Sequence, residues 1–447
     1  MQNNVKGFGF RGWMLMIYQF LANLSMVVFT NYPMNALSQI YSPKNPQLLS
    51  MLFTVSMVVG IVIQLILSAN IGKVKSVKNL SIAIGVAAMV FSAGVMLIKP
   101  DLQGGNLVVP WAVCYFMSCL LIIIWCTFVI GVLIGQWFPR RKGTVMGLVT
   151  IAFPLGNALL NVFMKLTMGG GMPNPTAGFL PFFIVTCVGI LIGIVFITDY
   201  PEQCGAYRDN DKSMTPEIAN AMMMQEIEDK KHTVWTIGNT FKCPDFWLIT
   251  LPAGMMLFGS VGMMTQTAGV IGSYGYGADS KEFGLIMLGV AVVAIIGSTL
   301  LGLLDTKVGT RKAMMAAFGF MIASGVIGAI QQFPCMVIAM LLLGVFMGAS
   351  SNFTVSAAVQ YWRREDFPSV FARVNPIANL CQAVAPMILV AILSSVGYHG
   401  DFILVGVMGV VSMIMVAMVK PDRIKAMDDK YRTAAGKSLD DALVGRK

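Results

Sequence analysis

Long apolar stretches alternate with short polar connections along nearly the whole chain. Each stretch runs for about twenty residues with few charges, the length that an α-helix needs to cross a bilayer. We predict twelve spans, at residues 13–37, 47–69, 79–98, 110–136, 144–167, 177–198, 245–271, 282–304, 312–331, 334–360, 369–393 and 401–419. The first is too long for a cleavable signal, and no small-residue cleavage site follows it.

The composition supports a membrane protein. Of the 447 residues, 56% are hydrophobic and only 12% are charged, about half the charged fraction of soluble proteins. The eight cysteines show no metal-ligand spacing, and six of them lie inside apolar stretches. We therefore interpret them as small buried hydrophobes and expect no metal or other cofactor.

The basic residues fix the expected orientation. When alternate connections are assigned to one side, that side and the two tails hold 27 of the 31 Lys and Arg residues. Because cytoplasmic loops carry the positive charge, we expect both termini in the cytoplasm and a multi-pass protein of the inner or plasma membrane. The positive charge behind the net value of +10 is then explained by the orientation of the spans in the membrane. Nucleic acid is not an expected partner.

A long polar stretch divides the chain in the middle. It contains Thr215-Pro216-Glu217, which resembles the start of a helix and predicts a short one over 215–231. Six spans lie on each side. We predict a first six-helix bundle at 1–198, a cytoplasmic linker with a short helix at 199–244, a second bundle at 245–419 and a cytoplasmic tail at 420–447.

The two halves also resemble each other in sequence. Residues 136–141 (QWFPRR) close the fourth span and residues 360–364 (QYWRR) close the tenth, at an offset of 224. Residues 154–157 (PLGN) and 376–379 (PIAN) repeat in the fifth and eleventh spans, at an offset of 222. Such a parallel repeat predicts a substrate site between the halves, near the middle of the membrane.

The connection after the eighth span, residues 302–312 (GLLDTKVGTRK), resembles the G-x-x-x-D-R-x-G-R-[RK] signature of the major facilitator superfamily, with one residue of displacement on either side of the acid. The resemblance implies the major facilitator fold, in which twelve transmembrane helices form two pseudo-symmetric bundles. It also implies a cytoplasmic latch, with Asp305, Arg311 and Arg140 as gating candidates. A purely structural turn is the alternative.

Two further segments, residues 200–207 (YPEQCGAY) and 242–248 (KCPDFWL), resemble the oxalate/formate antiporter group of that superfamily. In this group, a basic residue in the eighth span and a lysine in the eleventh bind a dicarboxylate. Here the eighth span contains no Lys or Arg, and the eleventh contains only Arg373. Oxalate is therefore not expected, whereas transport is.

Polar residues recur at helical spacing inside the spans. Because buried polar groups in lipid need partners, these residues are expected to face the bundle interior, where they either line a wet cavity or join neighbouring helices. For the set as a whole we favour a cavity. The candidates for substrate binding are Gln19, Asn23, Asn157, Asn161, Gln266, Asn352, Asn379, Gln382 and Arg373.

Two basic residues allow two interpretations each. Arg373 points away from the amide face of its span and lies near the membrane edge, so a structural role competes with anion binding. Lys165 lies on the polar stripe of the fifth span, where it either attracts an anion or anchors the helix end.

Asp and Glu are missing from mid-membrane positions, and Glu282 and Asp401 at span ends come closest. Because a proton relay usually needs an embedded carboxylate or His, this favours exchange or a substrate that carries its own proton. We expect a monomeric secondary active transporter for a small organic anion, preferably a carboxylate. A carrier or efflux pump for a neutral or amphipathic compound is the alternative, and a membrane sensor is an alternative of another class. Nothing indicates an enzyme.

Overall fold

The computed structural model describes residues 7–33, 37, 47–71, 74–99, 108–139, 141–153, 155–156, 175–211, 213, 215–231, 233–277, 280–363, 366–437 and 439. Every regular element in these ranges is helical. The first half contains α1 (Phe10–Met26), η1 (Val27–Asn31), α3 (Gln47–Asn70), α4 (Val77–Leu97), α5 (Val109–Ile123), η4 (Ile124–Val129), α6 (Ile130–Trp137), α7 (Lys142–Val149) and α9 (Pro175–Phe196).

The second half contains α12 (Pro244–Gly272), α13 (Lys281–Val308), α14 (Thr310–Gly328), α15 (Phe333–Met347), α16 (Ser350–Tyr361), α17 (Phe367–Val396) and α18 (Tyr398–Ala417). Between the halves lie η5 (Pro201–Cys204), η6 (Arg208–Asn210), α10 (Pro216–Lys231) and α11 (Ile237–Phe241), and α19 (Pro421–Ala434) follows the last span. Helix α10 occupies the stretch in which the sequence predicts a short helix.

Ten of the described helices, some of them joined end to end, are long and apolar enough to cross a membrane. The other two predicted spans are the fifth and the ninth. The fifth is described over α7 and a few following residues only. The ninth is α14, whose first turn contains the charged residues Arg311 and Lys312. The all-α fold class is confirmed.

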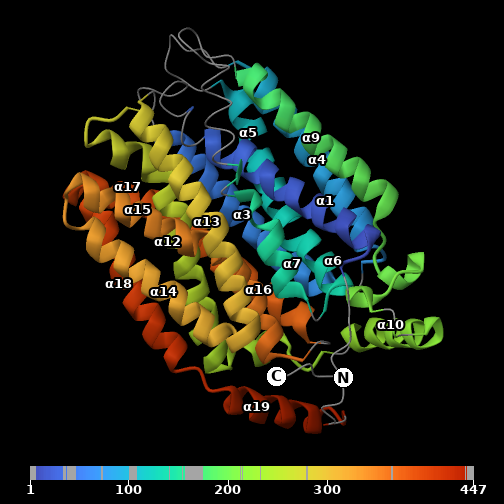
Figure 1. Cartoon of the computed structure of the whole chain (residues 1–447). Helices are drawn as coiled ribbons and strands as arrows, with labels where there is room; N and C mark the ends of the chain where they lie inside the picture. The colour runs from blue at the N-terminus through green and yellow to red at the C-terminus, as the bar shows by residue number, and fades with distance from the viewer. Residues whose placement is uncertain are drawn as a thin grey trace.

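The helices form two bundles, each with its own apolar core. Figure 1 shows the first-half helices, from blue to green, on one side and the second-half helices, from yellow to red, on the other. Helices α1, α10 and α19 reach the same end of the molecule, which we call the terminal end. The even number of spans that the sequence predicts requires this placement.

Glycines allow helices of one bundle to pack backbone against backbone. A Cβ at Gly348 would lie 2.0 Å from the carbonyl oxygen of Ala294, and a Cβ at Gly325 would lie 2.4 Å from Cα of Gly406. Any larger residue would push α13 from α15, or α14 from α18. In lipid no hydrophobic effect drives helices together, so their association depends on the close van der Waals packing that small residues allow.

Buried ion pairs attach α19 to the second half. Asp428 accepts hydrogen bonds from Nε of Arg363 at 2.7 Å, from Nε of Arg432 at 3.1 Å and from Nε1 of Trp235 at 2.9 Å. Arg432 also donates to Asp366 at 2.5 Å. The tail helix and the end of the linker therefore form one structural unit with the terminal end of the second bundle.

Candidate functional site

A central cavity lies between the two halves. It is lined by α1, η1, η4 and the α7 region from the first half, and by α12 and α15–α17 from the second half. Its volume is about 90 Å³, which leaves room for several waters or a small molecule. The polar lining residues are amides and hydroxyls: Gln19, Asn23, Asn31, Thr127, Thr150, Ser260, Thr265, Ser350, Ser351, Thr354, Asn375, Asn379 and Gln382.

The amides of α1 hold each other in place. Nε2 of Gln19 donates to Oδ1 of Asn23 at 2.9 Å and to the carbonyl oxygen of Cys126 at 2.8 Å. Nδ2 of Asn23 donates to the carbonyl oxygen of Val149 at 3.2 Å. These bonds tie α1 to η4 and α7, so the first-half side of the cavity is well ordered by its own hydrogen bonds.

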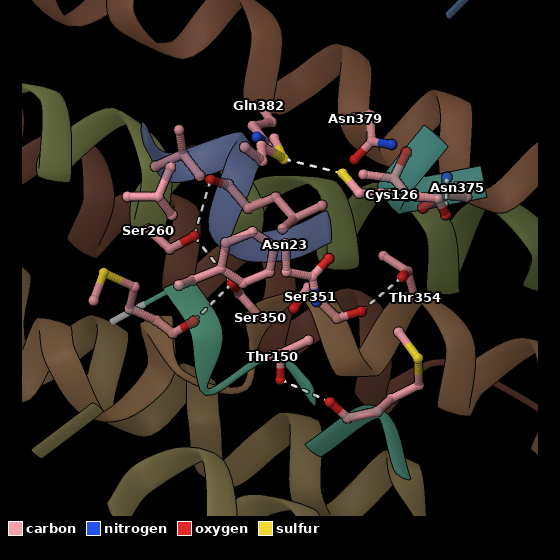
Figure 2. A pocket seen from close by; sticks show the side chains of 18 of the residues that line it. Asn23, Cys126, Thr150, Ser260, Ser350, Ser351, Thr354, Asn375, Asn379 and Gln382 are labelled. Atoms are coloured by element: carbon pink, nitrogen blue, oxygen red, sulfur yellow. Dashed lines mark hydrogen bonds between the residues drawn. The ribbon is translucent and has the colours of Figure 1, made fainter. Parts of the chain in front are cut away.

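Three amides of α17 form the facing wall. Asn375, Asn379 and Gln382 follow at intervals of four and three residues, so they share one helix face, and Figure 2 shows them around the cavity. Asn375 donates across the halves to the carbonyl oxygen of Thr127 at 3.4 Å. Asn379 and Gln382 are among the candidates that the sequence singled out, and Asn375 joins them on this face.

Short hydroxyl side chains complete the second-half wall. Ser260 of α12 and Ser350 of α16 lie 3.1 Å apart, Oγ to Oγ. Thr354 donates to the carbonyl oxygen of Ser351 at 2.9 Å. In Figure 2, Ser260 and Ser350 lie on the opposite side of the cavity from Asn375 and Asn379. Sequence reasoning did not single out these lining hydroxyls, because Ser and Thr occur widely in membrane helices.

Two of the lining segments are π-helical. Such wide turns interrupt the regular hydrogen-bond ladder and are frequent at functional sites. In η4, the carbonyl oxygens of Cys126 and Thr127 accept from Gln19 and Asn375. In η1, the carbonyl oxygen of Thr30 accepts from the Tyr115 hydroxyl at 2.9 Å. Side chains therefore bind carbonyls of the widened turns, and one of these bonds crosses between the halves.

Five sulfur atoms contribute to the apolar part of the wall. The thiol of Cys126 donates to Sδ of Met26 at 3.5 Å, the contact between two sulfurs that is dashed in Figure 2. The five lining residues are Met26, Cys126, Met146, Met264 and Met347. We call them the sulfur wall. They come from five different elements, α1, η4, α7, α12 and α15, so both halves contribute.

The structure places some predicted site residues away from the cavity wall. Asn352 is buried beside it and accepts the Thr150 hydroxyl at 2.9 Å. Gln266 is buried on α12 but does not line the cavity. Asn157 and Asn161, like Lys165, lie outside the described residues.

Arg373 also lies outside the cavity. Its Nη1 donates to the carbonyl oxygen of Trp235 at 2.7 Å and to the Thr240 hydroxyl at 2.8 Å. Both partners belong to the segment that leads from the linker into α12. Of the two interpretations that the sequence left open, this geometry agrees with the structural one.

The gating candidates make contacts within the second half. Asp305 accepts the Thr310 hydroxyl at 2.6 Å, and the Thr310 amide donates to Oε1 of Gln360 at 2.6 Å. Arg311 donates to the carbonyl oxygen of Ala417. These bonds close the turn between α13 and α14 and attach it to α16 and α18. Arg140 lies outside the described residues.

Hydrogen bonds also join the two halves beside the cavity. Toward the terminal end, the Ser298 hydroxyl of α13 donates to the carbonyl oxygen of Gly147 of α7 at 3.1 Å. Farther along α17, the Thr54 hydroxyl of α3 donates to the carbonyl oxygen of Ala383 at 2.9 Å. The halves are therefore joined by hydrogen bonds at residues that line the cavity or lie next to its lining.

Comparison with known proteins agrees with this architecture. Residues 246–439 match the family model of the Major Facilitator Superfamily. The human organic anion transporter MFSD10 (TETRAN) superposes with a TM-score of 0.67 at 10% identity, over 93% of this chain and 100% of that one. The proton:xylose symporter XylE bound to 6-bromo-6-deoxy-D-glucose superposes with a TM-score of 0.66 at 15% identity, over 93% and 98% of the two chains. No curated protein sequence matches the chain.

Residues 246–439 therefore resemble the Major Facilitator Superfamily, and the helices have the fold of the solved carriers with which the chain superposes. The fold is the one predicted from the loop between the eighth and ninth spans. The oxalate/formate subgroup receives no support from these comparisons.

Proposed function

We propose that the protein is a secondary active carrier that moves a small organic molecule by alternating access between its two halves. One observation supports this most strongly: both halves contribute amides, hydroxyls and sulfurs to a single cavity, beside which hydrogen bonds join the halves. In this proposal, residues 1–198 and 245–419 are the moving bundles, 199–244 is the linker, and both termini with the tail 420–447 face the cytoplasm. The protein acts as a monomer in the cell membrane.

The cavity wall favours an uncharged substrate. None of its described residues is a Lys, Arg, His, Asp or Glu. Burying an unpaired carboxylate among apolar and neutral groups costs several kcal/mol or more. An amphipathic neutral compound, or a weak organic acid in its protonated form, fits this wall without that penalty. The wall therefore favours the neutral or amphipathic compound over the free anion that the sequence suggested.

The sulfur wall favours an apolar body on the substrate. Methionine is unbranched and polarisable, so it adapts to irregular shapes and contacts aromatic rings favourably. Amides on α1 and α17 supply the polar contacts that orient such a molecule. The mode that we propose is exchange, because the described lining holds no carboxyl or imidazole to relay a proton.

Counterflow tests the proposal. Purified protein in liposomes is loaded with one compound, and uptake of labelled acids, their amides and neutral amphipaths is measured with and without a protonophore. We expect uptake of neutral compounds that the protonophore does not change. Uptake of ionised dicarboxylates alone would support the anion carrier instead, and no uptake of any compound would favour the sensor.

A further inference from the structure

Two buried polar atoms in the cavity wall lack hydrogen-bond partners. Gln19 is 1% exposed and Asn379 is 3% exposed. Within the described residues, Oε1 of Gln19 and Nδ2 of Asn379 accept or donate no hydrogen bond. Other buried atoms share this property, but among the cavity-lining residues described here these two side chains are the ones that have it.

An atom of this kind is costly. Leaving a buried donor or acceptor unsatisfied costs about 1–3 kcal/mol, and such groups in native proteins often have a functional reason. Nε2 of Gln19 is already engaged by Asn23 and Cys126, which fixes the amide and leaves its oxygen as the free acceptor. Asn379, on α17, offers the free donor from the other half.

We infer that Gln19 Oε1 and Asn379 Nδ2 form one recognition site for an uncharged group that carries both a hydrogen-bond donor and an acceptor. Primary and secondary amides, hydroxy-carbonyl groups and undissociated carboxylic acids belong to this class. Their donor binds Gln19 and their acceptor binds Asn379. The inference rests on the proposed function and makes its substrate class specific.

Ionised carboxylates do not fit this site. A carboxylate has acceptors only, so it leaves the Gln19 oxygen without a donor and brings a charge into a wall with no described counter-charge. A neutral ligand that binds both atoms joins α1 of the first half to α17 of the second half. Binding therefore favours the conformation in which the halves lie close together.

An isosteric ligand pair tests the acceptor. N-methylbutanamide and methyl butanoate differ in one position, where the amide has N–H and the ester has oxygen. Their binding to the purified full-length protein in detergent is measured by calorimetry. We expect the amide to bind about 10-fold tighter, within a range of roughly 5- to 150-fold for one unsatisfied buried group. Equal affinities would overturn the inference.

Variants of Asn379 test the donor. Asn379→Leu removes it, and Asn379→Asp replaces it with an acceptor at unchanged size, which keeps the test usable if the leucine variant does not fold. Both are expected to bind N-methylbutanamide about 10-fold more weakly. The matched control is Gln136→Leu, a buried amide of α6 outside the cavity whose Oε1 also lacks a partner, which should leave the affinity unchanged.

The possible results distinguish failure of the recognition site from failure of the proposed carrier function. Loss of affinity in both Asn379 variants, with the control unchanged, supports the recognition site. Unchanged affinity in the Asn379 variants would contradict it even if counterflow occurs. If the protein shows no counterflow with any compound, the proposed carrier function itself fails, whatever the binding data show.

Discussion

Thr150 and Asn352 join the two halves of the molecule directly, through a hydrogen bond of 2.9 Å from the Thr150 hydroxyl to Oδ1 of Asn352. Both side chains are buried, and Thr150 also lines the cavity. Ser298 makes a second such contact with the backbone of Gly147. One hydrogen bond between the halves therefore comes from a side chain that also lines the cavity.

Thr150→Val removes this hydroxyl while keeping the side-chain volume. A typical hydrogen bond contributes about 0.5–1.5 kcal/mol net, so we expect the closed-to-open equilibrium constant at the terminal end to fall by a factor of about 2 to 13. Spectroscopic labels at the exposed positions of Lys75 and Lys307 report the distance between the halves. A distance distribution identical to that of the wild type would show that this bond does not stabilise closure.

Replacing Arg373 with leucine should affect stability and leave ligand affinity unchanged. The variant loses two hydrogen bonds from a charged donor, to Trp235 and Thr240, each with a contribution of about 1.5–3 kcal/mol. We expect a lower melting temperature, partly restored by Arg373→Lys. Normal melting together with lost binding of organic acids would instead support anion binding by Arg373.

Asp428 holds together the contacts between α19 and the second half. Asp428→Ala leaves Arg363 and Arg432 without this buried partner, and breaking a buried ion pair costs about 3–5 kcal/mol. We expect a marked loss of thermal stability in detergent. Asp422→Ala, in the exposed first turn of the same helix, is the control and should change stability by less than about 1 kcal/mol. Equal effects of the two variants would contradict the proposed attachment.

The methionines of the sulfur wall should determine how many shapes the cavity accepts. Substituting leucine at Met26, Met146, Met264 and Met347 keeps the volume and removes flexibility. The expected result is retained uptake of the best neutral substrate and reduced uptake of compounds with a different shape. An unchanged substrate range in counterflow would show that thioether flexibility plays no part.

Much of the architecture follows from the sequence because a helix that crosses lipid needs a long and nearly uncharged apolar stretch. Apolar stretches of spanning length, the distribution of basic residues and the loop after the eighth span predicted the helical fold. Amides at helical spacing indicated side chains in the bundle interior, and four of them, Gln19, Asn23, Asn379 and Gln382, line the cavity. A buried amide in lipid has few alternatives to the bundle interior, whereas the role of these residues in substrate binding stays a prediction.

The remaining features depend on tertiary contacts that spacing does not reveal. Arg373 binds a linker segment more than 130 positions earlier in the chain, and no local pattern marks Trp235 as its partner. Gln266 and Asn352 carry side-chain amides like the lining residues but lie outside the cavity wall. The π-helical turns η1 and η4 have no distinct sequence signal, since a helix widens where packing requires it.

Protection of Cys126 from labelling tests whether the substrate passes through the cavity between the halves. Its thiol lines the cavity, whereas Cys381 on α17 lies against the position of Gly254 on α12, outside the cavity. Each cysteine is kept alone in a variant that lacks the other seven, and labelling with a small neutral thiol reagent is followed with and without a transported compound. If the substrate occupies the cavity, we expect the compound to slow labelling of Cys126 but not of Cys381, and labelled Cys126 to stop counterflow. Equal labelling rates with and without the compound, or full counterflow after Cys126 is labelled, would contradict a substrate path through this cavity.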